Sequence, residues 1–171
     1  MAKKISLREF QESVVAKLQS VASAEFMPGL SRLGVQVGAQ NWLVDLADVS
    51  EVVPLPAMVP VPLTHRWFSG LANVRGVLYG VVDFGDFLGG EPMQPSLDRR
   101  LLLANARFAV NSGIVVNRVL GLRNLEQMQR RDAGSDTAWV AAEYVDADGR
   151  EWKELDMRRL VEDTGFLNVG L

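Results

Sequence analysis

Residues 70–84 read GLANVRGVLYGVVDF, and this stretch decides the class of fold. We expect a single extended segment over residues 71–83, bent at Gly76 and Gly80, because glycine inside a strand pattern marks a bulge or a bend. A brief helix over residues 84–88 should follow, since a glycine pair comes directly after it.

Short strands are expected on both sides of this stretch. They cover residues 35–37, 42–46 and 49–53 before it, and residues 100–104, 113–122, 139–145 and 151–155 after it. Asp148-Gly149 predicts a hairpin turn, because both residues tolerate positive φ. Asp156 predicts the N-cap of a short closing helix. Many short strands with few small helices favour a mostly-β barrel architecture over an α/β one.

Residues 1–28 predict an amphipathic helix ahead of the β region. Leu7, Phe10, Val14, Leu18 and Val21 recur at spacings of three and four, which places them on one helix face. This face has two interpretations. It packs on the body of the protein, or it forms an arm that docks a partner.

A proline-rich segment, residues 54–62, reads PLPAMVPVP and holds four of the seven prolines of the chain. Proline has no N–H to donate to a β-ladder, so this segment predicts an extended connector instead of a central strand. The connector is either laid over the surface or a ligand for an SH3-like domain.

Length and composition exclude several classes of protein. The chain has 171 residues, which suits one domain or two closely joined lobes. A net charge of −3 without a long basic run argues against a nucleic-acid partner. The absence of cysteine excludes disulfides and thiolate metal sites. No signal peptide and no run of about 18 apolar residues is present, so we expect a cytoplasmic protein that does not insert into membranes.

Residues able to carry catalysis are few. His65 is the only histidine, and no nucleotide-binding, nucleophile-elbow or zinc-protease motif occurs. Asp83 and Asp86 lie near glycines, where aspartate is common as a turn or cap residue. The alternative to a binding protein is therefore a small β-barrel enzyme or ligand-binding domain that uses His65, Asp83 and Asp86. We expect no cofactor and no metal.

Residues 70–84 resemble the signature of CheW-like domains, which have a glycine, two apolar residues, Asn-Leu-Arg-Gly and then an apolar run ending in aspartate. Residues 42–46 and 49–52, the proline connector, and GIVVNRV at 113–119 are similar to further family segments in the same order. Gly80 and Asn117 depart from the family, which usually has proline and aspartate there. These features resemble the branch of the family found in type IV pilus (twitching motility) chemosensory systems.

The resemblance implies a fold of two small five-stranded, SH3-like β-barrels that share a core. It covers about residues 33–166, with residues 1–28 as an added N-terminal helix and a short helix at the C-terminal end. It also implies a function without catalysis: an adaptor that binds the regulatory domain of a CheA-type histidine kinase and the cytoplasmic tip of a methyl-accepting chemoreceptor. Such a protein is recruited to membrane-associated receptor arrays and is monomeric in isolation. The third possibility, a regulatory fragment of a larger kinase, is disfavoured because kinase motifs are absent.

Arg75 is the leading candidate for partner binding, together with Asn73 beside it. A guanidinium can form an internal ion pair that braces the bend, or it can contact a partner directly, and Glu51 is its candidate counter-charge. Gly70 and Gly76 are expected to shape the backbone.

Val49, Val115 and Val119 complete the set of candidate site residues. They either line an apolar groove that receives a receptor helix or pack in the core, as strand valines usually do.

Overall fold

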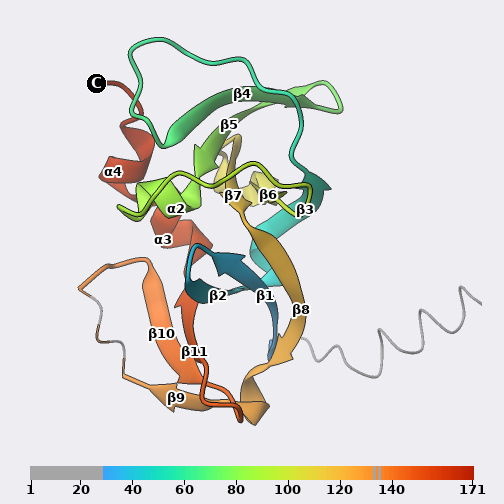
Figure 1. Cartoon of the computed structure of the whole chain (residues 1–171), viewed down its shortest axis with the longest axis vertical. Helices are drawn as coiled ribbons and strands as arrows, with labels where there is room; N and C mark the ends of the chain where they lie inside the picture. Colours follow the sequence, from blue (N-terminus) through green and yellow to red (C-terminus); the bar gives the residue numbers. More distant parts are fainter. Residues whose placement is uncertain (1–28, 133, 135) are drawn as a thin grey trace, which may run out of the picture.

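The computed structural model describes residues 29–132, 134 and 136–171. Two β-sheets lie one above the other along the long axis of the molecule (Figure 1). The predicted N-terminal helix over residues 1–28 lies outside the described residues.

The first sheet has six strands in the order β8-β1-β2-β11-β10-β9. Its strands are β1 (Ser31–Val37), β2 (Gln40–Val44), β8 (Arg118–Asn124), β9 (Gln129–Arg131), β10 (Val140–Val145) and β11 (Glu151–Leu155). Only β2 and β11 pair in parallel; the other neighbours are antiparallel.

The second sheet has five strands in the order β3-β6-β7-β5-β4. Its strands are β3 (Val49–Pro54), β4 (Phe68–Val74), β5 (Val77–Asp83), β6 (Arg100–Ala104) and β7 (Ser112–Val116). β5 and β7 run in parallel, and the remaining pairs are antiparallel. Strands β3 and β4 are therefore the two edges of this sheet.

The chain passes from the second sheet back to the first at Asn117, between β7 and β8. The Asn117 backbone N–H donates to the Gln36 carbonyl at 2.8 Å, and its side-chain oxygen accepts from the Gly38 N–H at 2.7 Å. Asn117 thus ties the crossover to the turn between β1 and β2. The expected β-rich run over 113–122 comprises two strands in different sheets.

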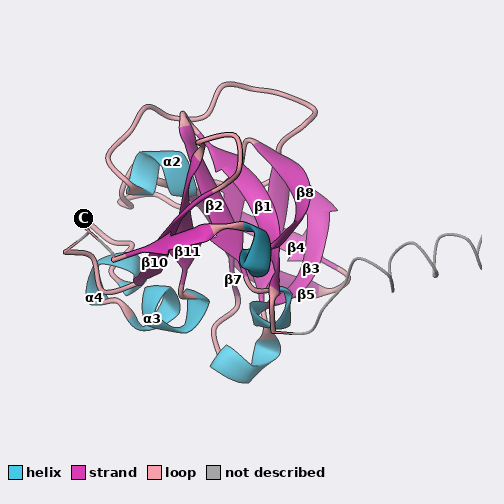
Figure 2. Cartoon of the chain, turned by 90° about the horizontal axis from the view of Figure 1, so that it is seen from below, coloured by secondary structure: helices cyan, strands magenta, loops and turns pink. Residues whose placement is uncertain are grey.

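Within the described residues, three short helices flank the strands: α2 (Phe84–Phe87), α3 (Met157–Glu162) and α4 (Thr164–Leu167). In Figure 2 all three lie toward the left of the view, with β10 and β11 between α2 and the pair α3 and α4. Their N-cap residues are Asp83, Asp156 and Asp163, and the carboxylate of each accepts a backbone N–H of the first helical turn. Three 3₁₀ turns, Leu46–Asp48, Ala106–Phe108 and Leu125–Gln127, complete the elements.

One hydrophobic core joins the two sheets. Trp42 of β2 contacts Phe84 of α2 edge-on at 5.3 Å between ring centroids and stacks on Trp139 at 5.9 Å. A smaller cluster inside the six-stranded sheet contains Leu43 and Trp152. Strand β2 is therefore buried on both faces.

The mostly-β prediction with two joined sheets is confirmed. One sheet has a sixth strand because the three-residue β9 pairs with β10. The prediction of one bent segment over 71–83 is wrong: the chain reverses at Arg75-Gly76 and forms the hairpin β4–β5, with Val74 opposite Val77. Both turn residues have positive φ, +52° and +85°, as a two-residue turn between antiparallel strands requires.

Candidate partner-binding site

The tip of the β4–β5 hairpin presents Arg75 to solvent. Arg75 takes a positive φ, which L-residues adopt at a cost in strain. The Asn73 side-chain oxygen accepts the Gly76 N–H at 2.9 Å and stabilises the turn. The hairpin thus holds the Arg75 backbone in a fixed position while leaving 78% of its side chain exposed.

Arg75 pairs with Glu51 through both ends of its guanidinium. The Nη2–Oε1 distance is 2.7 Å and the Nη1–Oε2 distance is 3.0 Å. Glu51 lies on β3 and Arg75 at the end of β4, so the ion pair joins the two edge strands. The five-stranded sheet is accordingly curled until its edges approach each other.

An exposed ion pair of this kind contributes only about 0–1 kcal/mol to stability, because water screens both charges. Stability alone is thus a weak reason for placing a strained arginine at the tip. The pair is open to a partner while its geometry is already set.

The outer face of the hairpin continues this site with apolar side chains. Leu71 lies opposite Gly80 and Asn73 opposite Leu78, so these residues share one face. Leu71 and Leu78 are exposed at 36% and 57%. Strand alternation could have placed them on one face, but no sequence signal shows that this face is turned to solvent. We call Leu71, Asn73 and Leu78 the hairpin face.

The three candidate valines are not brought together at the surface. Val115 is 2% exposed and Val49 is 9% exposed, and both belong to the core shared by the sheets. Val119 lies in β8 of the other sheet, where it is 37% exposed beside Leu122 at 40%.

The two candidate glycines occupy different surroundings. Gly70 has φ +132°, and a Cβ there would lie 2.3 Å from the Val59 carbonyl oxygen. Val59 and Leu71 exchange backbone hydrogen bonds of 2.8 and 2.9 Å at this point, which attaches the proline connector to the edge of β4. Gly76 meets nothing within 4 Å and supplies only the positive φ of the turn.

His65, Asp83 and Asp86 do not form a catalytic group. Asp83 accepts the backbone N–H of Asp86 at 3.1 Å and that of Met93 at 2.9 Å. Both Asp86 oxygens are held by Arg66, at 2.6 and 2.9 Å. His65 instead stacks on Trp67 at 5.4 Å.

The described part of the chain holds no cluster of three or more histidine and acidic side chains able to bind a metal ion. None of its helices combines the length and apolar character needed to cross a membrane.

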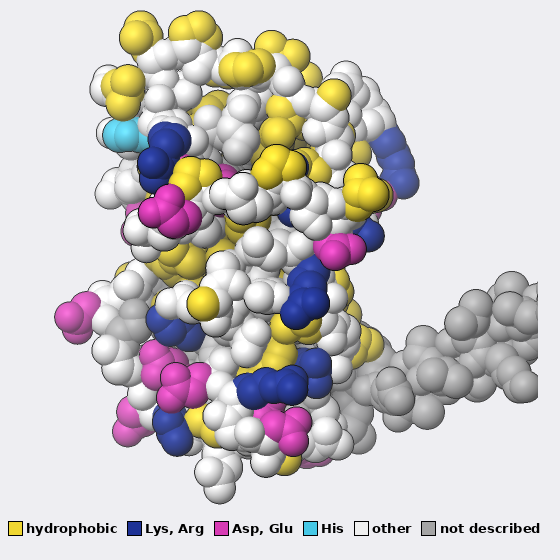
Figure 3. All heavy atoms as spheres, in the orientation of Figure 1, with side chains coloured by type: hydrophobic (Ala, Val, Ile, Leu, Met, Phe, Trp, Pro, Cys, Tyr) yellow, Lys and Arg dark blue, Asp and Glu magenta, His cyan; other side chains and the backbone are white. Residues whose placement is uncertain are grey.

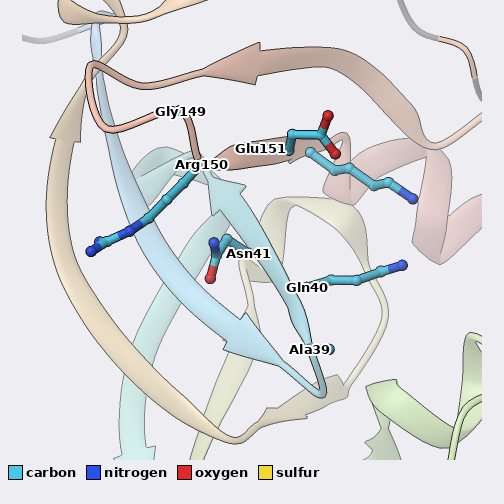
Figure 4. Close-up of a pocket in the computed structure, with 7 residues that line it drawn as sticks. Ala39, Gln40, Asn41, Gly149, Arg150 and Glu151 are labelled. Atoms are coloured by element: carbon cyan, nitrogen blue, oxygen red, sulfur yellow. The ribbon is translucent and has the colours of Figure 1, made fainter.

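A polar hollow of about 510 Å³ lies between the β1–β2 turn and the β10–β11 turn (Figure 4). Gln40, Asn41, Arg150, Glu151 and Lys153 contribute to its lining. The Arg150 side chain points away from Asn41 in this view. The lining lacks histidine, serine and cysteine, so it offers no nucleophile with a partner base.

The described residues thus form a mostly-β scaffold of two joined small sheets flanked by short helices. The family model of the CheW-like domain matches residues 31–165, and the chain belongs to the CheW-like family.

Within that family the chain is of the PilI type. It is 30% identical to Protein PilI of Pseudomonas aeruginosa over 156 residues, which cover 88% of this chain and 85% of that protein. It is 23% identical to Chemotaxis protein CheW of Thermotoga maritima over 77% of this chain and 87% of that protein.

The fold has a solved counterpart. The crystal structure of scaffolding protein TtCheW from Thermoanaerobacter tengcongensis superposes with a TM-score of 0.67 at 22% identity, covering 81% of this chain and 96% of that one. The resemblance drawn from residues 70–84 is thus confirmed. The chain is a CheW-like scaffold protein and not an enzyme.

Proposed function

We propose that this protein couples the cytoplasmic tip of a methyl-accepting chemoreceptor to the regulatory domain of a CheA-type histidine kinase, in a chemosensory system that controls type IV pili. Family membership and the similarity to PilI support the system. The bidentate, solvent-exposed Arg75–Glu51 pair supports the site and is the observation that carries the proposal. The protein acts as a monomeric adaptor recruited to membrane-associated arrays.

The site comprises Arg75, Glu51 and the hairpin face. Arginine is enriched among the residues that dominate binding energy, and such residues lie beside apolar surface that excludes water. Here one hairpin carries the preset guanidinium at its tip and exposed Leu71 and Leu78 on its outer face. A partner that covers this face buries the ion pair, which strengthens its electrostatic interactions.

A second contact surface lies on the other sheet. Val119 and Leu122 are exposed on the edge strand β8 and offer an apolar strip to an amphipathic receptor helix. In this proposal Val49 and Val115 support the strands from the core, while Val119 touches the partner.

Charge reversal tests the site. Arg75→Glu and Glu51→Arg should each weaken binding to the kinase domain or the receptor tip at least about tenfold, equal to about 1.4 kcal/mol. The double variant restores the pair with its polarity exchanged. If Arg75 contacts the partner, binding stays weak; if Arg75 only braces the sheet, binding returns.

The matched control is the pair Arg131–Glu151, which is also exposed but lies in the six-stranded sheet. Reversing either of its charges should leave binding unchanged. If Arg75→Glu and Glu51→Arg each bound the kinase domain and the receptor tip as tightly as the wild type does, the proposed site would be contradicted.

A further inference from the structure

An open groove runs along the proline connector, away from the Arg75–Glu51 pair in the site proposed above. It encloses about 510 Å³, within the range of peptide and small-molecule sites. Its lining contains Pro54, Leu55, Pro56, Ala57, Met58 and Pro60. Ser69 of β4 and the loop residues Ser96, Leu97 and Arg99 complete it.

The groove is apolar and contains a single charged side chain. Residues 54–64 carry no charge, and Leu97 at the rim is 97% exposed. Figure 3 shows hydrophobic side chains gathered at the end of the molecule that carries the connector, at the top of the view. An almost fully exposed leucine beside an apolar wall is typical of an interaction site.

Arg99 is the one charge in this lining, and its Nε–H is buried without a hydrogen-bond partner. Across the described residues no carboxylate pairs with Arg99, although its neighbour Arg100 donates to the carbonyls of Leu97 and Arg99 at 2.7 and 2.9 Å. That Nε–H is closed to solvent, so a partner would meet the terminal N–H groups of Arg99, whose side chain is half-buried. Among unmodified side chains, a carboxylate matches the planar guanidinium, since the two can form parallel hydrogen bonds.

The groove is already formed without a partner. Hydrogen bonds between Val59 and Leu71 attach the connector to β4. Directly after the connector, the Leu171 N–H donates to the Leu63 carbonyl at 3.0 Å. A preformed groove lowers the ordering cost of binding, and prolines lower it further because their φ is fixed.

We infer that this groove binds an extended apolar segment of a partner protein that carries an aspartate or glutamate, whose carboxylate pairs with Arg99. The apolar side chains of the segment pack on the connector and Leu97. The site is independent of receptor–kinase coupling, since it shares no residue with the Arg75–Glu51 pair or the hairpin face.

Selection from a display library of short random peptides on the full chain tests the inference. Enriched peptides should share an acidic residue flanked by apolar ones, and chemical shifts should change at Ala57, Met58, Ser69, Leu97 and Arg99. Arg99→Gln and Leu97→Ser should each lower peptide affinity at least tenfold. Arg150→Gln, which removes an exposed cation from the other sheet, should not.

Changing the acidic residue of the peptide to its amide provides a test that leaves the protein intact. It should lower affinity as much as Arg99→Gln does. No enrichment, equal binding to Arg99→Gln, indifference to the amide change, or shifts outside the groove would each overturn the inference. A concentration-dependent dimer abolished by Arg99→Gln would also overturn it, because the occupant would then be a second copy of the chain.

Discussion

Replacing Gly70 with alanine tests how the proline connector is attached to the second sheet. The new methyl group would lie 2.3 Å from the Val59 oxygen, 2.8 Å from the Val59 carbonyl carbon and 3.1 Å from the Pro60 Cα. All three are backbone atoms, so no side-chain rotation relieves the clash. The connector has to move away from β4.

The magnitude follows from two contributions. Alanine at φ +132° costs about 1–3 kcal/mol in backbone strain. Separating Val59 from Leu71 removes two backbone hydrogen bonds, each worth about 0.5–1.5 kcal/mol. The expected loss in the free energy of unfolding is therefore about 2–6 kcal/mol, a large part of the stability of an ordinary domain.

Urea unfolding followed by tryptophan fluorescence measures this loss, since the chain has four tryptophans. Gly149→Ala is the matched control, because Gly149 has φ +78° but meets nothing within 4 Å. It should show the strain without the clash. If Gly70→Ala were no more destabilising than Gly149→Ala, the close approach of the connector to β4 would be refuted.

Three further predictions concern polar groups that stabilise the fold. Burial alone would raise the pKa of Asp146, but hydrogen bonds from the Trp152 indole and two backbone N–H groups lower it below 3.8. The ionised Asp146 therefore stabilises the fold above pH 3.8, and this stabilisation is lost as the pH falls through the lowered pKa. Asp146→Asn should make acid unfolding depend less on pH. It should also cost about 1–3 kcal/mol at neutral pH, because the buried Trp152 N–H loses a charged acceptor. Burial, and after it the Glu154 charge, raise the pKa of Tyr144 above 10.0. The tyrosine therefore ionises first in the unfolded chain, and the free energy of unfolding falls as the pH rises past 10. Tyr144→Phe should remove this loss of stability at alkaline pH. Arg66→Ala leaves the buried Asp86 carboxylate unpaired and should lower the thermal midpoint by several degrees, whereas an unchanged midpoint would show that Asp86 does not need its partner.

The strand content of this protein could be predicted from local patterns, but its strand connections could not. The connector at 54–62 was largely predictable because proline is restricted to the edges and ends of β-sheets, and Pro54 indeed ends the edge strand β3. The reversal at Arg75-Gly76 was not, since arginine at positive φ lacks the Asn-Gly or Asp-Gly signature of such turns. The crossover at Asn117 was hidden because apolar residues continue on both sides of it.

The candidate site was predictable only where charge decided the pairing. Glu51 was expected as the counter-charge of Arg75, and the structure places the two in bidentate contact. Whether a strand valine lies in the core or at the surface depends on which elements cover it, and this is set by tertiary packing. The unpaired Arg99 could not be foreseen either, because it depends on how the connector folds over the 96–99 loop.

The most direct test of the account is calorimetric titration of the full chain with the regulatory domain of the CheA-type kinase from the same organism, alone and with a fragment of the receptor tip. We expect saturable binding to the kinase domain. We also expect a complex of all three components, with at least one of the two interactions weakened by charge reversal at Arg75. Failure of the wild-type protein to bind either partner would contradict the assignment as a receptor–kinase coupling protein.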